Sequence, residues 1–301
     1  MSEHHCSHTP ANFSKAFAIG VGLNVLFVAT EAVFGITSHS LALLADAGHN
    51  LSDVFALLLA WAAAAVSQTA PTPQRTYGLR STSILAALFN GILLLIALGG
   101  ITWEAVRRFQ SPTPVDGTTV IMVAAVGIVI NTATALLFFS GRKGDLNIRG
   151  AFLHMAADAA VSAGVVVAGL VIVRTGWLWI DPVVSLGIVA VITIGTWSLL
   201  RDSLNLALHA VPPGIDALKV EEYLTRLPGI TDIHDLHIWA MSTTETALTV
   251  HLVKPDRALD DSLLARVQAE LSERFGINHV TIQCECGDAA HPCEQEPAHK
   301  V

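Results

Sequence analysis

Apolar and polar residues are arranged in long blocks along this chain of 301 residues. Six apolar runs are long enough to cross a bilayer as helices. They span about 13–36, a run that begins at 41, about 81–109, about 118–140, a run that ends near 173 and a run that ends near 208. Polar segments rich in proline or glycine separate several of these runs. The pattern predicts a domain of six transmembrane helices.

From residue 211 onward the pattern changes to that of a small water-exposed domain. Helical spacing in 216–227 and 260–275 and alternation in 230–241, 246–255 and 278–285 give the order helix, strand, strand, helix, strand. This order predicts an α+β layer with helices packed on one face of a three-stranded sheet. The predicted parts are an N-terminal tail (1–11), the membrane domain (12–209), the α+β domain (210–286) and a C-terminal tail (287–301).

The composition supports a membrane protein and argues against a nucleic-acid partner. Hydrophobic residues make up 52% of the chain and charged residues only 14%, and the mean hydropathy is +0.55. These values are too apolar for an ordinary soluble globule and fit a multi-pass protein in contact with lipid. The formal net charge of -8 gives no basic surface for nucleic acid.

Two of the apolar runs contain a histidine and an aspartate at the same spacing. His49 and Asp53 are four residues apart, and His154 and Asp158 repeat the spacing in a later run. Residues four apart share one face of a helix. Ionisable groups inside a membrane cost about 2.5 to 3.5 kcal/mol each, so they require a compensating interaction. Two such helices facing each other would offer two imidazoles and two carboxylates, a near-tetrahedral set suited to Zn2+ and related cations.

The alternative for each of these residues is a structural role, in which it caps a helix, hydrogen-bonds a neighbour or lines a static cavity. The repeated pair favours metal binding over that alternative. Asp46 and Asn50 are neighbours of His49, and either could orient the imidazole, line a water-filled path or make an interhelical hydrogen bond. For Asn24 and Glu31 we expect interhelical hydrogen bonds.

The motifs together resemble those of the cation diffusion facilitator family of metal transporters, zinc branch. The resemblance lies in SLALLADAGHNLSDV, RGAFLHMAADAAVSAGVV, the six predicted crossings and the HDLHIW segment of the terminal domain. It implies that His49, Asp53, His154 and Asp158 form the transport site. It also implies a homodimer, a ferredoxin-like cytoplasmic domain, and export of divalent metal in exchange for protons by alternating access.

The resemblance also implies metal ligands in the terminal domain, at His234, His251 and Glu285. Spacing alone leaves these residues open, because single histidines in strands are often surface residues. His237, in the same predicted strand as His234, has less claim, and we expect a structural role for it.

Both tails are rich in soft metal ligands, which favours metal binding there. The alternative is that the tails are disordered and bind metal only adventitiously. The resemblance extends to certain animal zinc transporters, whose N-terminal His-Cys-His motif meets the cytoplasmic domain of the neighbouring subunit. The candidate tail ligands are His4, His5, Cys6, His8, Cys284, Cys286, His291 and Cys293.

Basic residues near the predicted helix ends favour cytoplasmic termini in a plasma membrane, expected to be a bacterial inner membrane. With the termini inside, three basic residues lie outside: Arg107, Arg108 and Arg174. Seven lie inside: Lys15, Arg75, Arg80, Arg142, Lys143, Arg149 and Arg201. The Arg107–Arg108 pair argues the other way.

Transport of Zn2+, with Cd2+ or Co2+ as further substrates, is the function that the sequence predicts best. A membrane metal sensor that uses the terminal domain and tails is one alternative, but it leaves the four membrane ligands unexplained. An intramembrane zinc hydrolase is the least favoured, because it would keep an open coordination position and a nearby general acid or base. The leading prediction is therefore a transporter and not an enzyme.

Overall fold

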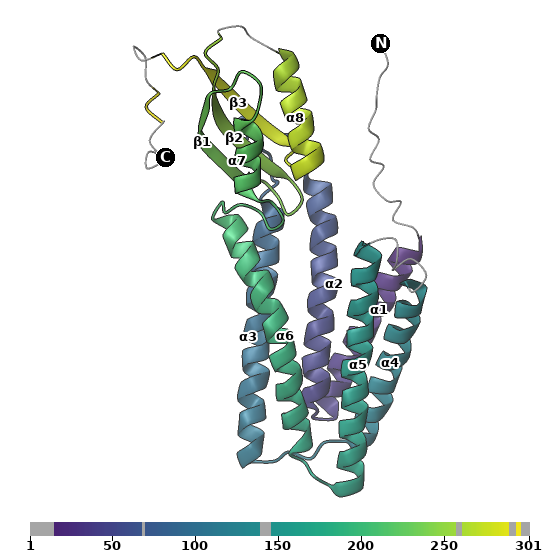
Figure 1. Cartoon of the computed structure of the whole chain (residues 1–301). Helices are drawn as coiled ribbons and strands as arrows, with labels where there is room; N and C mark the ends of the chain where they lie inside the picture. The colour runs from purple at the N-terminus through teal and green to yellow at the C-terminus, as the bar shows by residue number, and fades with distance from the viewer. Residues whose placement is uncertain (1–14, 68–69, 139–145, 257–260, 289–292, 296–301) are drawn as a thin grey trace. The chain divides into compact units, whose positions relative to one another are not determined.

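The computed structural model of the chain describes residues 15–67, 70–138, 146–256, 261–288 and 293–295 (Figure 1). Six long helices come first, followed by the helices and strands of the predicted α+β domain. The long helices are α1 (Lys15–Thr37), α2 (Leu41–Ser67), α3 (Thr82–Gln110), α4 (Gly117–Phe138), α5 (Leu146–Thr175) and α6 (Ile180–Ala207). The remaining elements are α7 (Ala217–Thr225), β1 (Asp232–Ala240), β2 (Thr246–Val253), α8 (Asp261–Phe275) and β3 (His279–Glu285). The predicted element order is confirmed.

Four segments within the described residues are long and apolar enough to cross a membrane: Thr82–Gln110, Gly117–Leu136, Met155–Thr175 and Ile180–Ala207. In α1 the described apolar stretch, Asn24–Thr37, is shorter than these segments. The structure thus supports a helical membrane domain, and the count of six crossings stays a prediction.

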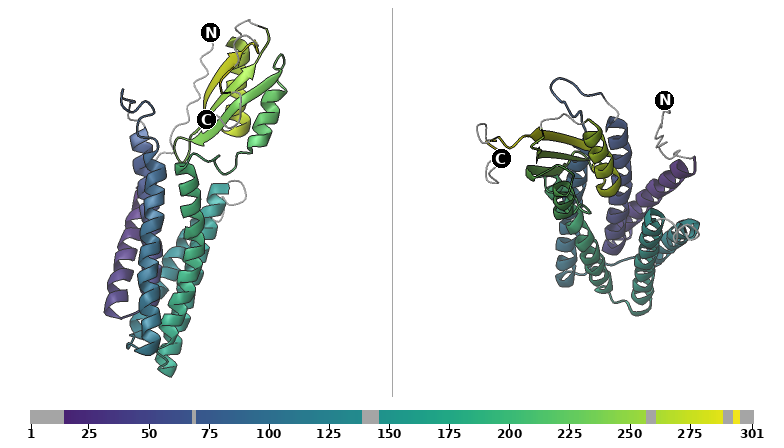
Figure 2. Two further views of the ribbon diagram at one scale, coloured as in Figure 1. Left: turned by 90° about the vertical axis from the view of Figure 1, so that its left-hand side faces the viewer. Right: turned by 45° about the horizontal axis from the view of Figure 1, so that its top comes forward.

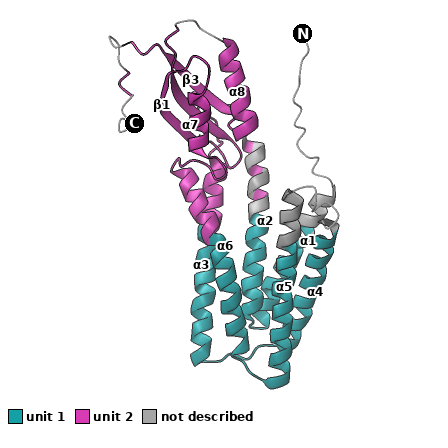
Figure 3. Cartoon of the chain, in the orientation of Figure 1, with its two compact units in different colours: residues 1–57, 92–196 teal, residues 58–91, 197–301 magenta. Residues whose placement is uncertain are grey.

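The chain divides into two compact units, coloured separately in Figure 3. The first unit comprises residues 1–57 and 92–196, and the second comprises residues 58–91 and 197–301. Helices α2, α3 and α6 are each shared between the two units.

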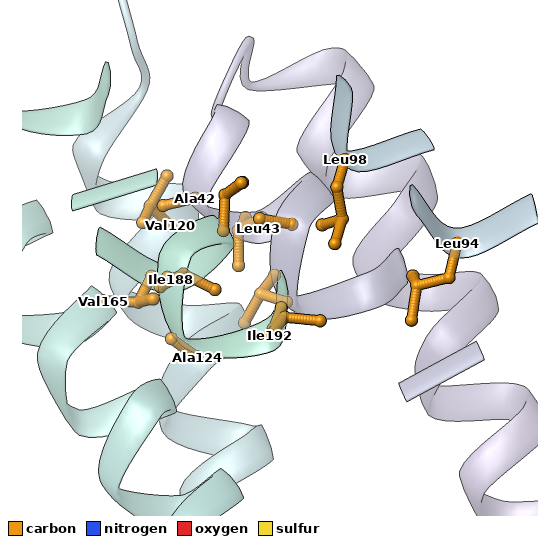
Figure 4. Packing of buried hydrophobic residues seen from close by; sticks show 12 residues of the cluster. Ala42, Leu43, Leu94, Leu98, Val120, Ala124, Val165, Ile188 and Ile192 are labelled. Atoms are coloured by element: carbon orange, nitrogen blue, oxygen red, sulfur yellow. The ribbon is translucent and has the colours of Figure 1, made fainter. Parts of the chain in front are cut away.

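The core of the first unit is an apolar cluster contributed by α2, α3, α4, α5 and α6 (Figure 4). Leu43 on α2 and Val165 on α5 are fully buried in it, and Ile192 on α6 packs beside them. Because α2 contributes residues from its first two turns, this core lies near the end of the unit that contains the α1–α2 turn. The core therefore closes that end around apolar side chains.

Helices α4 and α5 approach each other closely at two glycines. A Cβ atom built on Gly117 would lie 3.0 Å from the carbonyl oxygen of Gly169, and one on Gly169 would lie 3.1 Å from that of Gly117. Small residues at such crossings let helix backbones pack tightly where lipid supplies no hydrophobic driving force. This contact fixes the position of α5, the helix that carries Asp158.

The first turn of α2 is capped by a residue from a distant helix. Asp181, in the first turn of α6, accepts hydrogen bonds from the backbone N–H groups of Leu41 and Ala42, at 2.9 and 3.3 Å, and from the hydroxyl of Ser40 at 2.6 Å. The Ser40 hydroxyl accepts from the N–H of Leu43. Unpaired N–H groups at a helix start are costly away from water, so this cap stabilises the start of α2.

Arg108 completes this cap, which we call the Asp181 clamp: Asp181, Ser40 and Arg108. The Arg108 side chain donates to the backbone carbonyl of His39 and lies 3.4 Å from the Asp181 carboxylate, and both side chains are buried. Glu104 forms ion pairs with both Arg107 and Arg108. This arrangement gives Arg108 a structural role at the start of α2.

The terminal domain within the second unit is an α+β layer around a mixed three-stranded sheet of order β1-β2-β3 (Figure 2). Strands β1 and β2 pair antiparallel, whereas β2 and β3 pair parallel. Val220 and Leu224 of α7 and Val267 of α8 pack with Leu248 and Leu252 of β2 in one buried core. Both helices thus cover the face of β2 that carries residues 248 and 252, and residues 249 and 251 project from the other face.

The start of α3 is attached to the β1–β2 connection within the second unit. Arg80 forms an ion pair with Glu245 at 2.8 Å. The Ser83 hydroxyl accepts a hydrogen bond from the N–H of Thr243 at 3.1 Å. These contacts join the segment before α3 to the hairpin of the sheet.

We expect Asp181→Ala to lower the stability of the folded chain by about 3 kcal/mol, because it removes the acceptor for the first N–H groups of α2 and leaves the buried Arg108 without its partner. Thermal unfolding of the purified protein in detergent micelles measures the difference. Asp181→Asn, which retains an acceptor oxygen, should lose less. Equal stability of native protein and Asp181→Ala would contradict the role of the clamp.

Candidate metal centres

Three of the four predicted membrane ligands converge in the first unit. His49 and Asp53 lie on successive turns of α2, and Asp158 lies on α5. The His49 Nε2 atom is 3.6 Å from Asp53 Oδ2 and 3.4 Å from Asp158 Oδ1. One ligand atom from each of the three residues lies within 4.8 Å of the others. The side chain of His154, the fourth predicted ligand, lies outside the described residues.

These separations match what a tetrahedral ion requires. Ligand atoms about 2.0 to 2.2 Å from a tetrahedral Zn2+ lie about 3.3 to 3.6 Å from one another. The His49–Asp53 and His49–Asp158 distances fall in this range. The donor set of imidazole and carboxylate fits borderline divalent cations.

Exposure along α2 shows from which direction the three residues can be reached. Asp46 is 1% exposed, the His49 side chain 23% and the Asp53 side chain 35%, so accessibility rises toward the C-terminal end of α2. The Asp158 side chain is only 3% exposed. The apolar core, with Leu43 one to two turns earlier on α2, closes the opposite direction. Among the described side chains of α2, exposure of the candidate ligands thus increases from Asp46 to Asp53.

A pair of buried acids lies beside this cluster. Glu31 on α1 is fully buried and accepts a hydrogen bond from the Asn50 amide at 3.0 Å. Asp46 accepts one from the Ser162 hydroxyl of α5 at 3.3 Å. The hydrogen bond between Glu31 and Asn50 is of the interhelical kind expected for Glu31. Asp46 contacts Ser162 and, with Glu31, forms a pair that sequence spacing could not reveal.

A second cluster forms on the terminal domain, on the face of the sheet away from its helices. His251 on β2 pairs with His234 on β1, and the His251 Nδ1 atom is 3.3 Å from His234 Nε2. Glu285, the last residue of β3, places its Oε1 atom 2.8 Å from His251 Nδ1 and its Oε2 atom 3.3 Å from His234 Nε2. The three residues that the family resemblance implied as ligands therefore converge.

The C-terminal segment adds a sulfur donor to this cluster. Cys293 Sγ lies 3.5 Å from His251 Nδ1, and the ligand atoms of His234, His251, Glu285 and Cys293 all lie within 4.8 Å of one another. Imidazole nitrogen, carboxylate oxygen and thiolate sulfur are the donor types that a tetrahedral zinc-type ion takes. We call these four residues the terminal-domain cluster.

The other predicted tail ligands do not join this cluster in the described structure. Cys284 pairs with Leu252, so it projects from the helix-covered face of the sheet, opposite to Glu285. Cys284 and Cys286 are both exposed. Metal binding by Cys284 and Cys286 stays a prediction. His4, His5, Cys6, His8 and His291 lie outside the described residues.

Glu285 is held in its charged form. Partial burial opposes ionisation, but hydrogen bonds from Cys293 and Gln283 and the nearby His234 and His251 outweigh it and lower the pKa of the Glu285 carboxyl. The carboxylate is therefore charged at neutral pH and loses its charge only when the pH falls through a range below its ordinary value. An ionised carboxylate is the form that binds a metal ion.

A β-bulge in β1 determines which neighbours surround His251. The register shifts between His234, which pairs with His251, and His237, which pairs with Thr249, so β1 contains one extra residue there. Asp235 in this bulge has a φ of 51° and its Oδ2 atom lies 3.6 Å from His251 Nε2. His237 bonds to Asp235 at 2.8 Å and remains outside the cluster, consistent with the structural role expected for it.

Comparison with known families gives matches over most of the chain. Residues 17–206 match the family described as the cation efflux transmembrane domain, and residues 212–286 match the cation efflux protein cytoplasmic domain.

Several curated proteins are similar over nearly their whole length. The metal cation efflux system protein CzcD of Cupriavidus metallidurans is 36% identical over 300 residues, which cover 99% of this chain and 93% of CzcD. The zinc transporter ZitB of Escherichia coli is 34% identical over 98% of this chain and 94% of ZitB. A protein of Bacillus subtilis named cadmium, cobalt and zinc/H(+)-K(+) antiporter is 34% identical over 93% of this chain and 91% of that protein.

Among solved structures, the metal-bound C-terminal domain of the CzcD transporter from Cuprividus metallidurans matches with 40% identity. The match covers 24% of this chain and 99% of that domain, with a TM-score of 0.22.

The terminal-domain cluster predicts a sulfur ligand at Cys293. In the full-length protein loaded with Co2+, we expect Cys293→Ser to remove sulfur-to-cobalt charge-transfer absorption and to weaken binding by more than about tenfold, since a thiolate ligand is lost. Cys286→Ser, which changes an exposed cysteine outside the cluster, is the matched control and should retain both. Identical spectra for the two variants would show that Cys293 is not a ligand.

Proposed function

Because the chain belongs to the cation efflux family, we propose that it exports Zn2+ from the cytoplasm in exchange for protons, as a homodimer that works by alternating access. Cd2+ and Co2+ are further proposed substrates. The family is by name one of transporters, and among the similar proteins are a metal cation efflux protein, a zinc transporter and an antiporter of cadmium, cobalt and zinc. The matched cytoplasmic-domain family, named for a dimer, points to dimer formation.

The convergence of His49, Asp53 and Asp158 is the observation that carries the proposal. Two of these side chains come from α2 and one from α5, so an ion bound here would join two helices that are far apart in sequence. Ionisable residues inside a membrane domain are costly and mark pathways for ions. We assign these three residues, with His154, as the ligands of the transported ion.

The donor set supports transport more than storage. It contains imidazole nitrogen and carboxylate oxygen, whereas the terminal-domain cluster also contains the Cys293 thiol. Thiolates bind soft and borderline metals tightly. A transport site has to release its ion on the far side of the membrane, so a set without sulfur suits it better.

Proton exchange follows from the chemistry of these ligands. A metal ion binds neutral imidazole and ionised carboxylate, so loading the site displaces protons held by these groups. The coupling is reciprocal, because protons that arrive from the other side weaken metal binding there. His49, with its imidazole 3.4 Å from the Asp158 carboxylate, is suited to this competition.

The direction of exposure supports an inward-open conformation. With both termini in the cytoplasm, the C-terminal end of α2 faces the cytoplasm, and that is the direction in which exposure of the ligands rises from Asp46 to Asp53. The apolar core and the Asp181 clamp close the outer end. We propose that export requires this end to open after the ion has bound.

The terminal-domain cluster fits a resident metal ion. His234, His251, Glu285 and Cys293 would hold it, and the ion would tie β1, β2, β3 and the C-terminal segment together and offset the charges of the thiolate and carboxylate. This cluster also supports the second candidate function, a membrane metal sensor. An exporter carries metal across the membrane through the membrane ligands, whereas a sensor binds metal without transporting it.

We expect Asp158→Asn to reduce proton-driven Zn2+ uptake into sealed inverted vesicles by more than about tenfold, because it removes a charged ligand from the transport site. Zn2+ flux in the native protein should depend on the pH gradient and stop when the gradient is collapsed. A zinc-sensitive dye trapped inside the vesicles measures the initial rate.

Two variants of the terminal domain serve as controls for this assay. His237→Ala changes a histidine outside the terminal-domain cluster and should leave the Zn2+ flux unchanged. His251→Ala removes a residue of that cluster and leaves the proposed membrane ligands in place, so a change in its flux measures regulation by the terminal domain. Native protein that binds Zn2+ but moves none under any gradient would rule out the exporter and favour the sensor.

A further inference from the structure

Glu31 and Asp46 form a pair of buried acids that the metal ligands do not include. Glu31 on α1 is 0% exposed and Asp46 on α2 is 1% exposed. The two side chains lie within hydrogen-bonding reach of each other. Two ionised carboxylates at such a distance repel each other, and burial raises the cost further. The pair therefore needs a cation.

The hydrogen bonds around the pair compensate only part of its buried negative charge. Asn50 donates to Glu31 Oε2, and Ser162 donates to Asp46 Oδ2. The other two oxygens, Glu31 Oε1 and Asp46 Oδ1, are buried and accept no hydrogen bond from the described residues. One proton shared between the carboxyls turns their contact into a hydrogen bond and halves the buried charge.

A proton fits this pair better than a second metal ion. The described side chains around it offer two amide or hydroxyl donors, Asn50 and Ser162, which already bond to carboxylate oxygens. No histidine or cysteine joins Glu31 and Asp46 in a metal-type cluster within the described residues. A divalent ion would need four or more ligands, whereas a proton needs two oxygens.

The pair lies where it can respond to metal at the transport site. Asn50, which bonds to Glu31, follows His49 in the chain, and Asp46 is one turn before His49 on α2. The titratable groups that act electrostatically on the pair are His49 on α2 and Asp158 on α5. A dication bound to His49 and Asp158 favours ionisation of both acids, because opposite charges attract strongly in a buried environment.

We propose that Glu31 and Asp46 share one exchangeable proton in the metal-free protein and release it when Zn2+ occupies the site formed by His49, Asp53 and Asp158. The O–H bond of the shared proton breaks, the bonding electrons stay on the carboxylate oxygen, and the proton passes to water. This assigns part of the proton exchange to residues that are not metal ligands. The inference rests on the proposed transport function.

Counting protons released per Zn2+ bound tests this assignment directly. The purified full-length protein in detergent is titrated with Zn2+ in weakly buffered solution from about pH 6 to about pH 8, while a pH indicator records the protons and a metal dye records free Zn2+. We expect Glu31→Gln and Asp46→Asn each to bind Zn2+ and to release fewer protons than the native protein, with a difference that approaches one per ion.

Glu104→Gln is the matched control, because it makes the same change in an acid of α3 that pairs with Arg107 and Arg108 and not with Glu31 or Asp46. It should release as many protons as the native protein. Equal release by native protein and both pair variants across the pH range overturns the inference but leaves the transport site intact. Absence of Zn2+ binding to the native protein overturns the proposed function instead.

Repeating the titration with choline in place of K+ distinguishes a proton from another monovalent cation. Release that is unaffected by K+ supports the shared proton. If native and Glu31→Gln protein differ in proton release only when K+ is present, the pair binds that cation and the proposal of a shared proton is overturned.

Discussion

Buried charge is the constraint on which the helical unit depends. An ionised group away from water is stable only when an opposite charge, a set of hydrogen bonds or a bound cation compensates it. At one end of the unit Asp181 meets Arg108 and the first N–H groups of α2, so the compensation is complete within the protein. At His49, Asp53 and Asp158 two carboxylates lie beside an imidazole, and Glu31 and Asp46 form a second pair of buried acids. Under the proposed function, an exchangeable metal ion and an exchangeable proton compensate these groups.

The two metal clusters differ in the way a transporter and a resident site should differ. The membrane cluster joins α2 to α5 through nitrogen and oxygen donors, and its exposure rises toward one end of α2. The terminal-domain cluster is built on a sheet whose register places His234 opposite His251, and Cys293 adds a sulfur donor. A rigid sheet with a thiol ligand suits retention, whereas two helices that can move apart suit release.

Local sequence patterns predicted much of this architecture. The His-x-x-x-Asp pairs identified three residues that the structure brings together, because ligands one helical turn apart share a face whatever the tertiary arrangement. The element order of the terminal domain was correct for the same reason, since alternation and helical spacing are local. The predicted strands carried His234, His251 and Glu285 to one face of the sheet.

Contacts between distant segments could not be predicted from one sequence. Asp181 caps a helix that begins 140 residues earlier, and nothing near Asp181 in the chain indicates that partner. The Glu31–Asp46 pair depends on how α1 packs beside α2, so the sequence predicted an interhelical hydrogen bond for Glu31 but not its pairing with Asp46. The bulge that brings Asp235 toward His251 has no glycine to signal it, and the approach of Cys293 depends on the path of the segment after β3.

X-ray absorption spectroscopy at the zinc edge tests most directly whether the helices hold a metal ion through nitrogen and oxygen ligands alone. The sample is zinc-loaded full-length protein with the terminal-domain cluster removed by His234→Ala, His251→Ala and Cys293→Ser. We expect this protein to retain Zn2+ bound by nitrogen and oxygen and by no sulfur, and we expect the further change Asp158→Asn to remove the ion. A triple variant that retains no Zn2+, or retains it with sulfur ligands, would contradict the assignment of the membrane site.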